Sequence, residues 1–224
     1  MASPENRRPL KTRNTPMARR LARLLADRGA SPDLISATSV AFAALGGALL
    51  LTGGQAEGQI RALPFLGAAA CIQLRLLCNM LDGMVAVEHG AGSPVGPIWN
   101  ELPDRFADVL LLAGAGYSVW SSHLAGGAEA GWICACLALT TAYVRELGRG
   151  LGFPADFAGP MAKPQRMAAL TVGALASALE PLWGWRGVSL YIVLVVIGLG
   201  TAVTIARRTR TLARRLAERD REGS

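Results

Sequence analysis

The sequence predicts an all-α integral membrane protein with six transmembrane helices and an N-terminal amphipathic surface helix. Of the 224 residues, 51% are hydrophobic and only 17% are charged, whereas a soluble domain carries about 25% charged residues. Long uncharged stretches recur along the chain. The basic residues gather beside these stretches, where 20 of the 23 fall on one predicted face of the membrane.

The apolar stretches define the spans, because a helix that crosses a bilayer needs roughly 20 mostly apolar residues. Three stretches contain no charged residue: 34–56, 109–128 and 187–206. Three weaker stretches lie between them: 62–81, 131–144 and 167–179. The chain therefore divides into a basic N-terminal segment (1–33), a six-helix membrane domain (34–206) and a basic C-terminal tail (207–224) that continues the last helix.

The N-terminal segment holds eight basic residues and predicts a helix lying on the membrane surface. Apolar side chains recur there at helical spacing, with arginines largely between them, as in an interfacial amphipathic helix. These apolar residues are Met17, Leu21, Leu24 and Leu25. The Ser31-Pro32-Asp33 sequence then supplies the start signal of the first span.

The distribution of basic residues predicts the orientation. Six spans place both termini on the same side, and the positive-inside rule makes that side the cytoplasm. We therefore expect a multi-pass protein of the cell inner (cytoplasmic) membrane, in contact with membrane lipids. Aromatic residues do not interleave with the arginine clusters, so the basic charge does not indicate nucleic-acid binding.

Polar residues cluster around the loop between the second and third predicted spans. Asn79 and Asp82 share one face of a helix, and Asn100, Asp104 and Asp108 follow at steps of four residues. Pro103 is expected in the first turn of the third span, where a missing N–H is tolerated. Carboxylate and amide oxygens suit hard cations, so we expect one or two Mg²⁺ or Mn²⁺ ions here.

This cluster resembles the motif of the CDP-alcohol phosphotransferase family, D-x2-D-G-x2-A-R-x8-G-x3-D-x3-D. Every spacing is kept, and five of the eight motif positions match. The matching residues are Asp82, Gly83, Ala86, Gly96 and Asp104. The departures are Asn79 and Asn100 in place of Asp, and Val87 in place of Arg.

The resemblance implies a phospholipid-synthesising transferase, often a homodimer. A phosphatidyl group would move from a CDP-linked lipid such as CDP-diacylglycerol to an alcohol acceptor, releasing CMP. The implied roles are nucleotide contacts for Asn79, Gly83 and Ala86, metal ligation for Asn79, Asp82, Asn100 and Asp104, and general base work for Asp104.

The departures leave alternatives open. Glu101 and Asp108 lie beside the motif and can restore the lost charge, so Glu101 joins the candidate ligands and Asp108 the candidate catalytic residues. Arg75 or Arg105 can replace the missing arginine. The chain can also be an inactive or altered-chemistry relative that binds the lipid without transfer. A transporter is disfavoured, because the acidic groups lie at one face and not at the midplane.

Basic residues near the loop between the fourth and fifth spans are candidates for phosphate binding. Arginine offers bidentate contacts to phosphate and lysine a point charge. Together with Arg105, they are Arg145, Lys163 and Arg166. A positive-inside topology signal explains the same residues equally well. Their number favours an acceptor that itself carries phosphate, such as glycerol phosphate or inositol phosphate.

Overall fold

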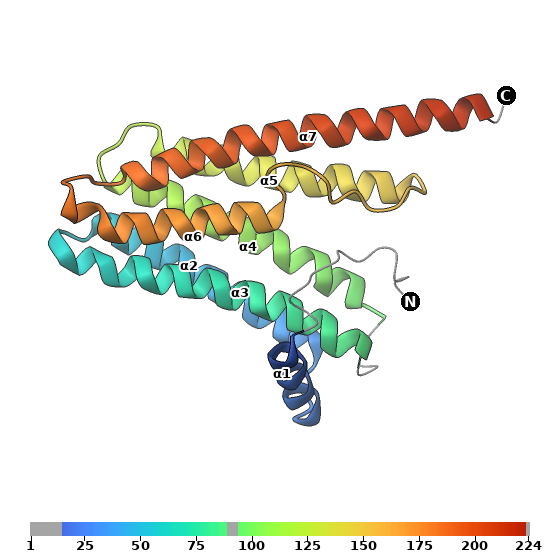
Figure 1. The fold of residues 1–224 in the computed structure, drawn as a ribbon, viewed down its shortest axis with the longest axis horizontal. Coiled ribbons are helices and arrows are strands. Elements are labelled where there is room, and N and C mark those ends of the chain that lie inside the picture. The colour runs from blue at the N-terminus through green and yellow to red at the C-terminus, as the bar shows by residue number, and fades with distance from the viewer. Residues whose placement is uncertain (1–14, 89–93, 223–224) are drawn as a thin grey trace.

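The computed structural model describes residues 15–88 and 94–222, except the side chains of Val87, Glu88 and Asn100. This part of the chain is helical and contains no strand (Figure 1). Its elements are α1 (Pro16–Asp27), α2 (Pro32–Gln55), η3 (Gly58–Arg61), α3 (Ala62–Glu88), α4 (Gly96–Ser121), α5 (Gly127–Gly150), α6 (Lys163–Leu179), η4 (Glu180–Leu182) and α7 (Val188–Glu222).

The six long helices α2 to α7 form a closed bundle. Each packs on two neighbours in the order α2, α3, α6, α7, α5, α4 and back to α2, and α4 also contacts α7. Figure 1 shows the turns α2–α3 and α6–α7 at one end of the bundle, and the C-terminal ends of α3 and α5 toward the other. We call these the far end and the site end.

Four of the six helices are long and apolar enough to cross a membrane. They are Pro32–Gln55, Gly58–Ala86, Gly127–Gly150 and Val188–Glu222. Helix α6 has only 17 residues, and the first half of α4 carries four charged side chains. The membrane character of the fold is thus confirmed, while the count of six spans stays a prediction.

Gly47 and Gly114 allow α2 and α4 to meet at backbone distance. A Cβ atom added to Gly47 would lie 2.5 Å from the carbonyl oxygen of Leu110, and one added to Gly114 would lie 2.6 Å from the carbonyl oxygen of Gly47. No side chain fits at these distances, as in other close membrane-helix pairs. This contact fixes α4, which carries most of the acidic residues of the site.

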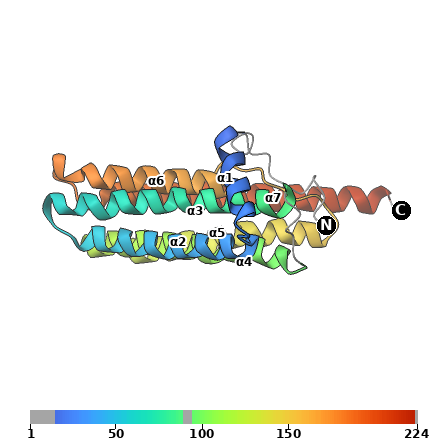
Figure 2. The ribbon, with the colours of Figure 1, turned by 90° about the horizontal axis from the view of Figure 1, so that it is seen from below.

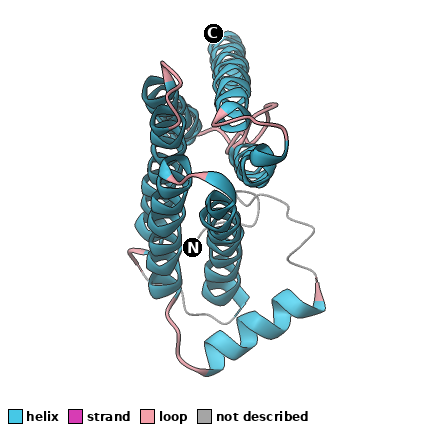
Figure 3. Cartoon of the chain, turned by 90° about the vertical axis from the view of Figure 1, so that its left-hand side faces the viewer, coloured by secondary structure: helices cyan, strands magenta, loops and turns pink. Residues whose placement is uncertain are grey.

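Helix α1 lies across the site end of the bundle, at a steep angle to the other helices (Figures 2 and 3). The Thr15 hydroxyl caps its start by accepting a hydrogen bond from the Ala18 N–H. Ala18 and Ala22 are buried in a cluster with Leu81 and Met84 of α3. Leu21 and Leu25 also pack against this cluster, so their predicted place on the lipid side is wrong. Met17 and Leu24 are exposed, and their contact with lipid stays a prediction.

Two helix boundaries differ between prediction and structure. Helix α4 starts at Gly96, so Pro103 lies inside it and not in its first turn. Pro97 lies in the first turn of α4 instead. Pro103 lies in the helix interior, where its missing N–H removes one backbone hydrogen bond. The predicted span 109–128 also runs past the end of α4 at Ser121. The basic tail is confirmed as a continuation of α7 to Glu222.

Candidate active site

Asp82 lies on α3 at the site end with one open carboxylate oxygen. Its side chain is buried, and the Ser36 hydroxyl of α2 donates a hydrogen bond of 2.6 Å to Oδ2. Oδ1 is buried and has no hydrogen-bond partner. A buried carboxylate oxygen without a donor is costly unless a cation or ligand completes it.

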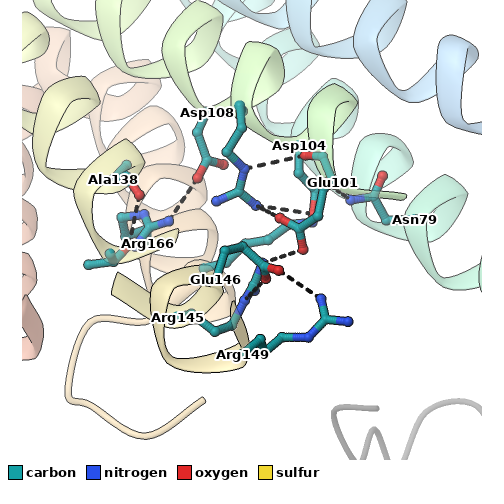
Figure 4. A network of polar contacts seen from close by, with 12 residues as sticks. Asn79, Glu101, Asp104, Asp108, Ala138, Arg145, Glu146, Arg149 and Arg166 are labelled. Atoms are coloured by element: carbon teal, nitrogen blue, oxygen red, sulfur yellow. Dashed lines mark hydrogen bonds and ion pairs between the residues drawn. The ribbon is translucent and has the colours of Figure 1, made fainter. Parts of the chain in front are cut away.

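Asp104 of α4 is the centre of a network of polar contacts (Figure 4). Its Oδ1 accepts hydrogen bonds from the Asn79 amide and, at 3.4 Å, from Arg75 Nη2. Its Oδ2 forms ion pairs with Lys163 and, at 3.7 Å, with Arg105 Nη2. Asn79 thus acts as a donor to Asp104, which an aspartate at that position would not do when ionised.

Asp108 lies one turn deeper and is closed off from solvent, with its side chain 1% exposed. Arg166 Nη2 of α6 lies 2.7 Å from Oδ2, and Arg75 Nη2 of α3 lies 3.1 Å from Oδ1. Both oxygens therefore have cationic partners. Asp108 joins three helices and is poorly placed to take a proton from a substrate.

The side chain of Glu101 contacts two arginines. It pairs with Arg145 of α5 and, at 3.6 Å, with Arg105. Arg145 Nε in turn contacts Glu146 at 2.9 Å (Figure 4). Within the described residues, no group of three or more His, Cys, Asp or Glu side chains is arranged to hold a metal. The rearranged acidic ligand set considered from the sequence therefore stays a prediction.

Lys163 and Asp104 form an ion pair. Each residue precedes the apolar stretch of its helix in the sequence, 167–179 in α6 and 109–128 in α4. Burial and the charge of Arg75 lower the pKa of Lys163 to about 8, although the two aspartates Asp104 and Asp108 raise it. Burial opposes ionisation of Asp104, but Lys163 and Arg75 outweigh it and hold the pKa of Asp104 below its usual value. Both groups are consequently charged for the most part at neutral pH.

The donor set fits one divalent cation. Mg²⁺ is usually held by one or two carboxylates and completes its shell with water and substrate phosphate. The open Oδ1 of Asp82 supplies such a carboxylate, and Asn79 on the same face of α3 has an amide oxygen. Asp104 already contacts four donor groups, so it offers little to a second ion.

The structure brings together most of the side chains predicted for the site. Asn79, Asp104, Asp108 and the four basic candidates form one connected set of contacts. Gly83 and Ala86 are half-buried on α3. The side chain of Asn100 lies outside the described residues.

Ser36 is the contact that sequence reasoning missed. It lies inside an uncharged span, where a serine is also typical of helix packing, so its sequence carries no signal of a partner. Only the approach of α2 to α3 places its hydroxyl on Asp82.

Comparisons with known proteins agree on one class of enzyme. No family model matches the chain. The phosphatidylinositol phosphate synthase of Streptomyces avermitilis is 28% identical over 207 residues, which cover 89% of this chain and 79% of that protein. The bifunctional IPC transferase and DIPP synthase of Rubrobacter xylanophilus is 35% identical over 160 residues, 69% of this chain but 33% of that longer protein.

Solved structures match the fold over most of its length. The phosphatidylinositol phosphate synthase of Mycobacterium tuberculosis with CDP-DAG bound superposes with a TM-score of 0.74 at 21% identity, covering 88% of this chain and 94% of that one. The same enzyme in complex with manganese and citrate gives a TM-score of 0.70 at 20% identity, covering 87% and 88%. A divalent metal in that structure agrees with the cofactor expected here.

The sequence, the fold and the relatives thus agree on a membrane enzyme that acts on a CDP-linked lipid in phospholipid synthesis. The predicted enzyme class is confirmed: the homologues of this chain are phosphatidylinositol phosphate synthases, which belong to the CDP-alcohol phosphatidyltransferase family.

Proposed function

We propose that this protein transfers the phosphatidyl group of CDP-diacylglycerol to the hydroxyl of an inositol phosphate and releases CMP. The observation that carries the proposal is the concentration of cationic side chains around Asp104 at the site end. Lys163, Arg105 and Arg145 are each partly exposed there, at 22%, 18% and 14%. An acceptor with its own phosphate would find three positive groups beside the reacting centre.

The donor is assigned to the α3 side of the site. The motif positions Gly83 and Ala86 present a surface with little bulk for the cytidine group, and Asn79 lies on the adjoining face. Asp82 would hold the divalent cation through its open oxygen. When bound, the cation neutralises the diphosphate and polarises the phosphorus under attack. Ser36 keeps the carboxylate of Asp82 in one orientation by its hydrogen bond to Oδ2.

The acceptor is assigned to the α5 and α6 side. Lys163 and Arg145 extend from these helices toward Asp104 and Glu101 of α4, so both lie at the rim of the network. For Arg166 we propose a role other than the phosphate contact predicted from the sequence. Its side chain is 2% exposed and pairs with Asp108, so we assign it to the support of the site.

Asp104 is the better candidate for the general base. It is 15% exposed, whereas Asp108 is 1% exposed with both oxygens engaged. Lys163 and Arg105 hold the Asp104 carboxylate in place, and an incoming phosphate would draw both cations away from Oδ2 and free that oxygen for the acceptor hydroxyl. The base must lie within hydrogen-bond reach of the proton that it removes.

The proposal also includes the membrane, the topology and the oligomeric state of the enzyme. We place it in the cell inner membrane as a multi-pass protein with both termini in the cytoplasm. The basic tail of α7 and the cations of the site end support this orientation, because positive charge favours the cytoplasmic side. We further propose a homodimer, as the family resemblance implies.

The proposal is tested by CMP release from CDP-diacylglycerol by the purified protein in detergent. Separate reactions contain inositol phosphate, glycerol phosphate or free inositol, each with Mg²⁺, Mn²⁺ or EDTA. We expect release only with inositol phosphate and a divalent metal. Asp82→Asn, which keeps the shape of the side chain, is the matched inactive control. CMP release with glycerol phosphate alone would change the proposed acceptor from inositol phosphate to glycerol phosphate. Binding of CDP-diacylglycerol without CMP release for any acceptor would favour an inactive relative.

A further inference from the structure

Arg75 is a buried charge in the middle of α3 that the mechanism above does not use. Its side chain is 0% exposed, and a buried charge is costly unless it is fully paired. Nη2 contacts Asp104 and Asp108, but Nε and Nη1 are buried without a hydrogen-bond partner. Nε and Nη2 of Arg61 and Nε of Arg166 are also buried without a hydrogen-bond partner, so Arg75 is distinguished by its contacts to two aspartates and not by its unpaired atoms.

The charge balance of the network gives Arg75 a role. Within the described network of ion pairs around Asp104, taken together with Asp82, cations outnumber carboxylates. The cations are Arg75, Arg105, Arg145, Arg149, Lys163 and Arg166, and the carboxylates are Asp82, Glu101, Asp104, Asp108 and Glu146. Before the substrate diphosphate binds, two divalent ions would add four positive charges to a network in which cations already outnumber carboxylates.

The geometry at Asp104 leads to the same conclusion. Asn79 and Arg75 both donate to Oδ1, and Lys163 contacts Oδ2. The positive charge next to the Asp104 carboxylate is therefore supplied by the side chains of Arg75 and Lys163. Among the described residues, Asp82 Oδ1 is the one carboxylate oxygen that is buried without a hydrogen-bond partner.

We propose that Arg75 is a positioning residue that lets the site operate with a single divalent ion. It acts through Asp104 and Asp108, which it holds together, and it supplies the positive charge that a second ion would otherwise have to supply. The catalytic part of this inference rests on the proposed transferase function. The number of bound ions can be measured without any turnover.

The first measurement is the number of Mn²⁺ ions bound by the purified full-length protein, followed by electron paramagnetic resonance. Ions of the site are those lost in Asp82→Asn, which separates them from Mn²⁺ held by surface carboxylates. We expect one such ion per chain in the native protein. Two ions, with the broadened signal of a spin-coupled pair, would overturn the proposal without any change at Arg75.

The second measurement uses a triple variant that reverses the charge balance: Arg75→Gln, Asn79→Asp and Asn100→Asp. It removes one cation and adds two carboxylates, so we expect the count of site ions to rise from one to two. Arg75→Lys keeps the charge and should still bind one ion. A triple variant that folds and still binds one ion would show that Arg75 does not set the ion number.

The third measurement is the Mn²⁺ concentration that gives half-maximal CMP release. Arg75→Gln should raise it at least tenfold, and Arg75→Lys should restore it to within about threefold of the native value. Arg61→Gln is the matched control, because Arg61 is another buried arginine paired with a carboxylate. It lies at the far end and should change neither the ion count nor the Mn²⁺ requirement.

The outcomes separate the two proposals. A native protein that binds one site ion but releases no CMP with any acceptor would overturn the proposed function and leave the role of Arg75 in ion number intact. A protein that releases CMP while Arg75→Gln keeps the native Mn²⁺ requirement would overturn the role of Arg75 alone.

Discussion

The two ends of the bundle each bury an arginine against a carboxylate, but they do so differently. At the far end, Arg61 of η3 lies 3.3 Å from Glu180 of η4. Glu180 also accepts hydrogen bonds from the backbone N–H groups of Gly187 and Ser189, at 2.7 and 2.6 Å. Both of its oxygens are therefore occupied, and its negative charge lies at the start of α7, where the helix dipole favours it.

At the site end, the carboxylates are shared among several helices and one oxygen is left over. Asp104 and Asp108 of α4 have partners on α3 and α6, yet Asp82 Oδ1 has none. This difference separates carboxylates that support the fold from carboxylates that can bind a ligand. A closed pair joins two turns and stabilises the fold, whereas an open acceptor within a network of cations is available to a ligand.

The largest expected effect is that of Asp82→Asn at the open oxygen. An amide keeps the shape but loses the charge that binds the cation, so we expect CMP release to fall about 10³-fold, equivalent to about 4 kcal/mol of activation free energy. The rate is measured at saturating CDP-diacylglycerol. The thermal midpoint should stay near that of the native protein. Retained activity would show that the metal does not bind at Asp82.

Asp108→Asn tests whether the buried part of the site end is structural. The change leaves Arg166 and Arg75 without their shared anion, which typically costs about 3–5 kcal/mol of folding stability. We expect the free energy of unfolding in detergent to fall by that amount, with about tenfold lower activity in the folded fraction. Native stability together with a complete loss of CMP release would instead make Asp108 the base.

Arg61→Gln applies the same kind of change to the far end. Glu180 would keep its two backbone donors but lose its cation, so we expect a loss of about 3 kcal/mol of stability. The rate of CMP release per folded molecule should not change, because the residue lies at the end opposite the site. Unfolding curves and rates are measured on the same preparation. A rate that falls in proportion to the loss of stability would mean that the two ends are coupled.

The smallest effect is expected at the rim of the site end. Arg149 pairs with Glu146 at 2.7 Å, but its side chain is 42% exposed. Pairs of this kind contribute at most about 0.5 kcal/mol. Arg149→Ala should therefore leave stability and CMP release close to native values. A marked rise in the KM for inositol phosphate would instead add Arg149 to the acceptor site.

Much of the fold was predictable from local sequence. The apolar stretches mark five of the six long helices closely, since burying an unpaired backbone in lipid is too costly for any other structure. Ser31 confirms the predicted start of α2 by capping it with a hydrogen bond from the Leu34 N–H. The boundary of α4 was harder, because Pro97 and Pro103 both suit a first turn and the sequence alone does not choose between them.

The sequence by itself determined the membrane class, the cation-rich face, and the spacing that brings Asn79, Asp82 and Asp104 to one site. These follow from composition and helical periodicity, which are local properties. Only the tertiary structure decided that Asn79 donates to Asp104, that Ser36 orients Asp82, and that Arg61 meets Glu180. Each of these contacts joins residues at least 25 positions apart, and their partners are chosen by how the helices pack.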